Sequence, residues 1–260
     1  MTPRGRTVKT DVDLNLDGRK SRITVADDDL ETVFLPVLRE LERQWRRRRR
    51  RFIVFLSGPP GSGKTTLAAL WEQLAREGRI DAPLQALPMD GFHYPNRVLD
   101  SQVVTLDGTP MPLRRIKGRP ESFDLPSIRQ SLHALKAGDP VRWPRYDRNL
   151  HDPVPDAISV LTEGIVIVEG LYMLLDRPDW KDLRAEADWG VFVECPADVS
   201  RADLLARNLR KGQSVEAATA HYNLVDHYTW RLTMEHRQGI NVLIRIGPGR
   251  RPEIVPTTHA

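Results

Sequence analysis

The chain of 260 residues is poor in cysteine and lacks any long apolar run, and both shortages exclude classes of protein. The single cysteine, Cys195, cannot form an internal disulfide, and its place after an apolar segment indicates a buried, unreactive thiol rather than a nucleophile. No apolar run approaches the roughly 18 residues of a membrane-spanning helix, and none follows the N-terminal positive charges as in a secretory signal. We therefore expect a cytoplasmic protein without a membrane partner.

The net positive charge is also small, and many of the basic residues behind it are gathered in one segment. The formal net charge is +4, and residues 46–51 are all arginine. Such a run can bind nucleic acid or an anionic membrane, or it can be the solvated end of a helix, where cations suit the negative end of the helix dipole. Because neither interleaved aromatic residues nor a second basic cluster supports nucleic acid, we favour the helix end and disfavour a nucleic-acid partner.

Apolar residues are plentiful enough for a packed core, at 40% of the chain against 28% charged residues. Short apolar runs alternate with segments of helical period, which predicts an α/β fold with an open, mainly parallel sheet covered on both faces. We expect strands at residues 52–56, 84–89, 164–169, 189–194 and 241–246, and helices at about 30–48, 65–76, 125–137, 198–211 and 215–234.

Residues 58–65, GPPGSGKT, match the G-x-x-x-x-G-K-[ST] pattern of a phosphate-binding loop, with an apolar strand before it and an amphipathic helix after it. Glycines allow the backbone N–H groups to turn toward phosphate oxygens, and the helix N-terminus adds positive potential. In such a loop the lysine reaches the β- and γ-phosphates and the threonine hydroxyl coordinates Mg²⁺. We therefore predict ATP and Mg²⁺ as cofactors, bound by Gly58, Pro59, Pro60, Gly61, Ser62, Gly63, Lys64, Thr65 and Thr66.

Two acidic residues that follow apolar strands are predicted to complete a reaction centre. Asp90 follows the second strand, and strand C-terminal ends face the ligand crevice in such sheets. It should then lie near the γ-phosphate, where a kinase needs a carboxylate to accept a hydroxyl proton. Glu169, at the end of the next strand, is predicted to hold Mg²⁺ together with Thr65 and Asp90. The structural alternatives, an aspartate that opens a turn with Gly91 and a capping or turn glutamate, stay open.

Basic and aromatic segments are predicted to surround this centre. Residues 114–124 are basic and could hold an anionic substrate, and residues 143–153 mix aromatic, charged and proline residues as a pocket wall does. Arg207 and Arg210 are three positions apart on a predicted helix, so they share a face that could stabilise the charge of a transferring phosphoryl group. Both the basic segment and this helix face could instead be merely solvated.

The motifs GPPGSGKTT, MDGFHYPNRVL, KGRPESFD, PRYD and VEGLY occur in this order and resemble the phosphoribulokinase/uridine kinase/bacterial pantothenate kinase superfamily. They are most similar to a nucleoside/nucleotide kinase-like branch, often described as proposed fructose-transport-system kinases, over about residues 30–246. The resemblance implies a P-loop NTPase three-layer sandwich and ATP-dependent transfer to an alcohol group. It also implies residue roles: Lys64 and Thr65 in the phosphate loop, Asp90 as catalytic base, Glu169 as the Walker B-like acid, and Arg207 and Arg210 in a lid helix.

On the substrate side, the resemblance places Lys117, Tyr146 and Arg148 in acceptor-binding motifs, to which we add His93, Tyr94 and Arg119. Arg148 stands where bacterial pantothenate kinases have a histidine, which argues against pantothenate and favours a more anionic or sugar-like acceptor. Related sequences also carry an asparagine shortly after the aspartate that matches Asp226, whereas the residues here are His227 to Trp230. A polar contact to substrate or nucleotide is therefore expected to differ.

We accordingly expect an ATP-dependent small-molecule kinase, with a nucleotide-binding switch or an ATPase without metabolite transfer as the alternative. We divide the chain into an N-terminal extension and helix, a kinase domain and a flexible tail. The extension begins with a small hairpin or a loose arm at residues 1–26, and Asp27 to Asp29 form the cap and acidic first turn of its helix. A homodimer is left open. The boundaries are 1–50 for the extension, 51–250 for the P-loop kinase domain with lid helices at about 198–234, and 251–260 for the tail.

Overall fold

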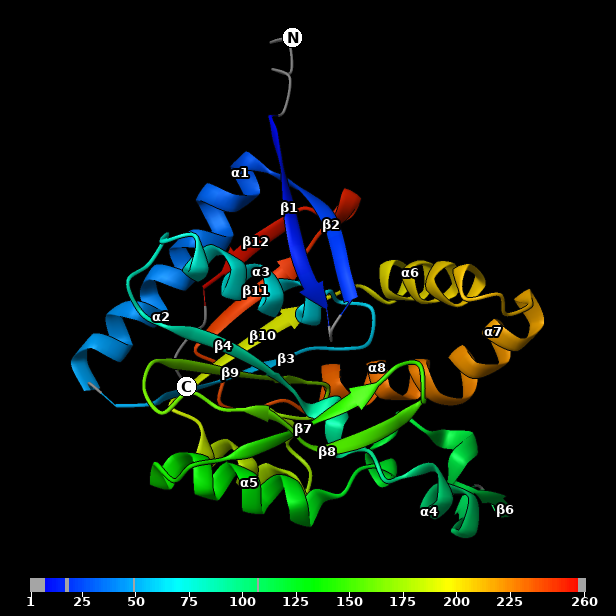
Figure 1. The fold of residues 1–260 in the computed structure, drawn as a ribbon. Coiled ribbons are helices and arrows are strands. Elements are labelled where there is room, and N and C mark those ends of the chain that lie inside the picture. The colour runs from blue at the N-terminus through cyan, green and yellow to red at the C-terminus, as the bar shows by residue number, and fades with distance from the viewer. Residues whose placement is uncertain (1–7, 17–18, 49, 107, 257–260) are drawn as a thin grey trace, which may run out of the picture.

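The computed structural model describes residues 8–16, 19–48, 50–106 and 108–256. Its centre is a six-stranded sheet in the order β12-β11-β10-β3-β9-β4, parallel except at the β11–β12 pair (Figure 1). All five predicted strands are present within two residues of the expected bounds. The strands are β3 Phe52–Ser57, β4 Leu84–Pro88, β9 Ile165–Gly170, β10 Trp189–Glu194, β11 Val242–Ile246 and β12 Pro252–Val255.

The central strand β3 shows why the core strands are continuous apolar runs. Successive side chains of a strand point to opposite faces of the sheet. Phe52, Val54 and Leu56 pack into a cluster with α2 (Leu35–Arg48) and α3 (Lys64–Arg76), whereas Ile53 and Phe55 pack on the other face with α5 (Leu125–Ala137). The sheet is therefore covered on both faces, as predicted, and forms the middle layer of a three-layer α/β sandwich.

Both of the longest predicted helices contain a π-helical turn. The first begins with α1 (Asp27–Asp29), continues through η1 (Leu30–Phe34) and runs into α2. Asp27 to Asp29 were predicted as the cap and acidic first turn of this helix. The acidic first turn is confirmed, but the cap is wrong, because Ala26 occupies the N-cap. The second helix, predicted at 215–234, consists of α7 (Val215–His221), η6 (Tyr222–Asp226) and α8 (His227–Glu235), and follows α6 (Ala197–Arg210). Among the described helices, none is long and apolar enough to cross a membrane.

The N-terminal segment forms a hairpin, β1 (Lys9–Leu16) and β2 (Arg19–Ala26), so the hairpin alternative is correct; its connection at residues 17–18 lies outside the described residues. Val12, Leu14 and Val25 are buried and join the same core cluster as α3. The hairpin is therefore packed against the helix that follows the phosphate loop.

Three segments differ from the sequence-based expectation. Residues 90–123, where no helix or strand was expected, contain short helices and a hairpin, and residues 143–153 lie in a hairpin that was not predicted. The expected flexible tail is wrong for its first part, because β12 pairs with β11; residues 257–260 lie outside the described part of the chain. The elements of the first two segments are η2 Met89–Phe92, α4 Asn96–Ser101, β5 Val103–Leu106, β6 Thr109–Pro112, η3 Leu113–Ile116, η4 Pro120–Ser122, β7 Arg142–Asp147 and β8 Asp152–Ser159. Two further short helices are η5 Lys181–Glu186 and η7 Pro248–Arg250.

The arginine run begins in the last turn of α2, as the helix-end interpretation predicted, but most of its described members are paired inside the protein. Arg48 and Arg50 both form ion pairs with the carboxylate of Asp188. Arg51 is only 4% exposed and donates hydrogen bonds to the carbonyl oxygens of Leu161, Leu135 and Asp139. A solvated helix end is thus the wrong description of Arg51, which joins three segments of the fold.

We predict that Arg51→Ala lowers the free energy of unfolding by about 2–3 kcal/mol, because three carbonyl groups, among them the buried one of Leu135, lose a charged donor. Urea unfolding followed by circular dichroism measures the change. Arg47→Ala is the matched control, since Arg47 is exposed at the end of α2, and it should change the same quantity by at most about 0.5 kcal/mol. Equal effects of the two substitutions would contradict the structural role of Arg51.

Candidate active site

The phosphate loop joins β3 to α3 at the C-terminal edge of the parallel sheet. At Gly58, a Cβ atom would lie 2.5 Å from the carbonyl oxygen of Val193, and Gly63 has a φ of +89° that favours glycine. Gly63 is the N-cap of α3 and supplies no side-chain cap, so the first N–H groups of the helix are available to an anion. The hydroxyl of Ser62 is buried without a hydrogen-bond partner in the described structure. Each observation fits a bound polyphosphate.

A cavity of about 300 Å³ lies over the N-terminus of α3. The phosphate loop forms one side of it, and α6 forms the other with Arg207 and Arg210. The structure therefore brings the two predicted lid arginines to the same space as Lys64 and Thr65. Arginines facing a phosphate site are suited to neutralise the charge of a phosphoryl group.

Thr65 and Glu169 meet because β3 and β9 are parallel neighbours. Leu56 near the end of β3 is paired with Glu169, and the hydroxyl of Thr65 at the start of α3 donates a 3.1 Å hydrogen bond to Oε1 of Glu169. Glu169 is only 6% exposed. A threonine hydroxyl beside a buried carboxylate at a phosphate loop fits Mg²⁺, which proteins bind through one or two carboxylates together with substrate phosphates.

Asp90 lies in η2, directly after β4, whose last residue pairs with Glu169. Its carboxylate is 3.6 Å from Nη2 of Arg148. Burial alone would raise the pKa of Asp90, but His93, Arg148, Lys64 and Arg207 together hold it below its ordinary value. Asp90 is therefore ionised at neutral pH and able to accept a hydrogen bond from a substrate hydroxyl.

The unpredicted hairpin β7–β8 fixes the position of Asp90. The carbonyl oxygen of Pro144 would lie 2.3 Å from a Cβ atom at Gly91, and Nε1 of Trp143 donates a 2.9 Å hydrogen bond to the carbonyl oxygen of Pro88. Gly91 is thus required for close approach of two backbones, which is a sharper account than the turn that the sequence suggested.

Both acids, Glu169 and Asp90, act on the pKa of Lys64. Burial lowers the pKa of Lys64, while the negative charges of Glu169 and Asp90 oppose this and Arg207 and Arg148 add to it. The centre therefore collects several cations around two carboxylates. Such an arrangement favours a strongly anionic ligand.

Three of the predicted substrate residues form one group beside Asp90. The rings of His93 and Tyr146 are 5.4 Å apart, and Nζ of Lys117 lies 4.8 Å from the centre of the Tyr146 ring. Nδ1 of His93 is 2.8 Å from the carbonyl oxygen of Asp90. With Arg148, these side chains supply cations and aromatic faces next to the predicted base.

Arg119 and Tyr94 do not join this group. Arg119 is buried, donates a 3.0 Å hydrogen bond to the carbonyl oxygen of Leu224 in η6, and lies 3.9 Å from the Tyr228 ring. Arg119 therefore joins the segment at 117–123 to η6 and α8. Tyr94 lines a different cavity of about 760 Å³, together with Trp180 and Tyr228.

Two residues that the sequence analysis passed over also face the site. Arg250 lines the phosphate cavity and forms an ion pair with Asp203 of α6. Its signal in the sequence is the Gly-Pro-Gly-Arg turn directly after a parallel strand, where ligand-binding loops gather. Asp203 carries no comparable signal, because its partner is distant in the sequence.

Comparison with known proteins agrees with this geometry. A family model described as the Phosphoribulokinase / Uridine kinase family matches residues 53–232. An uncharacterised protein of Escherichia coli K12, YggC, is 37% identical over 237 residues, which cover 90% of this chain and 95% of that protein. A pantothenate kinase of Lactiplantibacillus plantarum is 31% identical over 191 residues, covering 66% of this chain and 59% of the kinase.

A solved structure shows the same similarity in three dimensions. A protein of Silicibacter sp. TM1040, described as a proposed fructose transport system kinase, superposes with a TM-score of 0.71 at 32% identity. The superposition covers 82% of this chain and 98% of the other. The fold around the phosphate loop is thus shared with a protein named as a kinase.

Lys117 should react as an unusually nucleophilic amine. Burial and Arg114 lower its pKa to about 8, against the opposing charges of Asp152 and Asp90, whereas a free lysine side chain titrates near 10.4. Its charge is present below this pKa and is lost as the pH rises through it. Acylation mapped by mass spectrometry should therefore reach half its maximal rate near pH 8 at Lys117. A curve that rises only near the pH of free lysine would contradict this environment.

Proposed function

This chain belongs to the phosphoribulokinase/uridine kinase family of P-loop kinases, and we propose that it transfers the γ-phosphoryl group of ATP to an alcohol group of a small metabolite. The observation that carries the proposal is the meeting of Asp90 and Glu169 at the ends of two neighbouring parallel strands, beside the phosphate loop. A nucleotide switch needs no acid at the position of Asp90, whereas transfer to a hydroxyl does.

In the proposed reaction, Asp90 orients the acceptor hydroxyl and receives its proton. The hydroxyl oxygen forms a bond to the γ-phosphorus, and the bond from that phosphorus to the β–γ bridging oxygen breaks, so that its electron pair leaves with ADP. Lys64, Arg207 and Arg210 neutralise charge on the transferring group. Thr65 and Glu169 are the residues that would hold Mg²⁺, which supplies further charge neutralisation at the β- and γ-phosphates when bound.

The acceptor class follows from the group beside Asp90. Lys117 and Arg148 place two cations next to the base, and Tyr146 and His93 add ring faces. This combination favours a sugar-like or anionic alcohol over pantothenate, although a nucleoside or a pantothenate-like alcohol has the same reacting group. The demand for ATP fits a cytoplasmic reaction, and no nucleic-acid partner is needed.

We predict that Asp90→Asn lowers kcat by about 10²–10⁴-fold, because the amide cannot accept the proton. ADP formation should be measured with pools of sugars, nucleosides, pantothenate-like alcohols and phosphorylated sugars. The affinity for Mg·ATP, measured by calorimetry, should stay within about threefold, since Asp90 does not belong to the phosphate loop.

Lys64→Met serves as the contrasting variant and should lose Mg·ATP affinity itself, because its ammonium group reaches the phosphates. The proposal fails if Asp90→Asn turns over every active pool at the rate of the unsubstituted protein. It also fails if no pool raises ADP formation above basal hydrolysis.

A further inference from the structure

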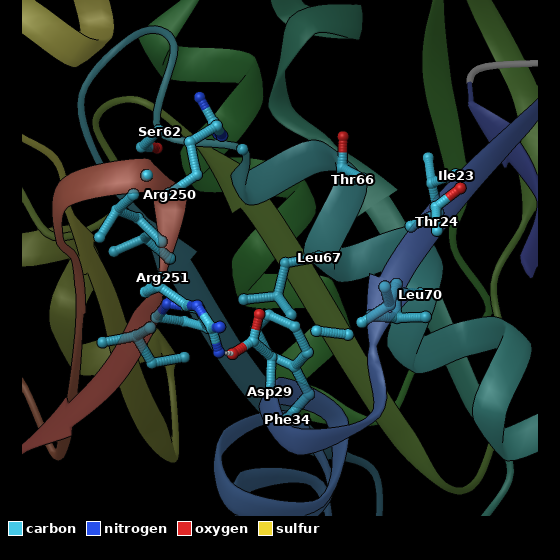
Figure 2. Close-up of a pocket in the computed structure, with 18 of the residues that line it drawn as sticks. Ile23, Thr24, Asp29, Phe34, Ser62, Thr66, Leu67, Leu70, Arg250 and Arg251 are labelled. Carbon is cyan, nitrogen blue, oxygen red and sulfur yellow. Dashed lines mark ion pairs between the residues drawn. The ribbon is translucent and has the colours of Figure 1, made fainter. Parts of the chain in front are cut away.

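A second cavity, of about 560 Å³, lies beside the phosphate loop (Figure 2). It shares Gly63, Thr66 and Arg250 with the phosphate cavity, so the two spaces adjoin. Its size is within the range of small-molecule sites. The phosphate cavity therefore opens onto this second cavity.

The walls of this cavity come mainly from parts of the chain outside the family match at 53–232. Residues 23–26 of β2 form one wall, Phe34 of η1 another, and residues 249–252 near the C-terminus a third. Only the phosphate loop, the first turns of α3 and Val193 contribute from within the matched region. The shape of the cavity is thus set by the N- and C-terminal segments of this chain.

We propose that this cavity binds the base and ribose of ATP, with the edge of β2 and the ring of Phe34 as its recognition surfaces. The inference rests on the proposed function, because it takes the phosphate loop as the site of the triphosphate. It goes beyond that function by assigning the N-terminal hairpin to nucleotide binding.

Ser62 and Arg250 lie where the two cavities adjoin. Ser62 lines the larger of the two cavities and is only 2% exposed, and its buried hydroxyl has no hydrogen-bond partner among the described residues. A buried hydroxyl without a partner costs free energy that a polar ligand removes. Arg250 lies at the same end in Figure 2, where its guanidinium could contact the α-phosphate or the ribose.

The backbone of β2 is suited to bind the edge of a base. In a strand, side chains alternate between two faces, so four consecutive lining residues indicate that the backbone of β2, and not one of its faces alone, borders the cavity. The hairpin has two strands only, and the outer edge of β2 has no neighbouring strand among the described residues. Such an edge carries unpaired N–H and C=O groups, which match the donors and acceptors of a heterocycle.

Phe34 supplies a planar surface in the same cavity. It is half-buried, and its carbonyl oxygen accepts a 3.0 Å hydrogen bond from Nε1 of Trp71, which fixes this turn against α3. Phe34 closes the π-helical turn η1, a distortion found frequently at functional sites. Aromatic rings bind bases by stacking with little dependence on sequence.

An ion pair holds the two terminal segments around the cavity. Arg251 beside β12 lies 3.6 Å from Asp29 at the start of the N-terminal helix, as the dashed line in Figure 2 marks. The hairpin, this helix and the C-terminal turn therefore line the same cavity. A ligand that contacts all three should stabilise their packing.

The experiment compares ATP with inorganic tripolyphosphate, both with Mg²⁺, by calorimetry on the full chain. Phe34→Leu keeps apolar bulk but removes the ring, so it should weaken ATP about tenfold and leave tripolyphosphate within about twofold. Phe34→Tyr keeps the ring and should restore the affinity for ATP. If Phe34→Leu weakens both ligands equally or neither, the assignment of the cavity is overturned.

Hydrogen exchange tests the hairpin without a substitution. ATP should slow exchange of backbone amides at residues 23–26, whereas tripolyphosphate should not. Equal protection by both ligands, or none by ATP, would contradict base binding at β2. If the unsubstituted protein binds neither ligand, the proposed kinase function fails together with this inference, whereas ATP binding with no effect at Phe34 or β2 defeats the inference alone.

Discussion

The parallel pairing of β3, β9 and β4 is the constraint on which the site depends. It fixes the register in which Leu56 and Pro88 both lie opposite Glu169. Parallel strands end at the same edge of the sheet. The phosphate loop after β3, Glu169 at the end of β9 and Asp90 after β4 therefore lie together at this edge, although they are far apart in the sequence. The buried apolar faces of these strands enforce the register, since a slip of one residue would turn every core side chain to the wrong face.

Charge is distributed around this edge so that a triphosphate completes it. Lys64, Arg148 and Arg207 act on the carboxylate of Asp90, Arg250 lines the adjoining phosphate cavity, and the positive end of α3 adds to them. The cations lower the pKa of Asp90 despite its burial. The arginines between α2 and the start of β3 act differently, because Arg48, Arg50 and Arg51 are paired with partners inside the protein. Arginine thus holds the fold together at one end of β3, and at the other end it lines the cavity that we propose binds phosphate.

The parts of the fold that could be predicted are those whose signal is local. Continuous apolar runs identified β3 and β9, and the glycine pattern identified the phosphate loop with its neighbours. The hairpin β7–β8 was not predicted because Pro144, Pro153 and Pro155 are disfavoured in central strands. A two-stranded hairpin has free edges, however, and edge strands tolerate proline. The cap at Ala26 and the partners of Arg51 depend on distant contacts. The cavity beside Gly63 also depends on distant contacts, because residues from both ends of the chain line it. No local sequence pattern predicts it.

We propose that the γ-phosphoryl group passes to an alcohol and not to water. The most direct test follows the phosphorus of ATP by ³¹P NMR while the protein acts on a pool of metabolite alcohols. Transfer to an alcohol predicts a new phosphomonoester resonance that grows in step with ADP. If every ADP formed is matched by inorganic phosphate, whatever alcohol is supplied, the chain is a hydrolase or a switch and the account is contradicted.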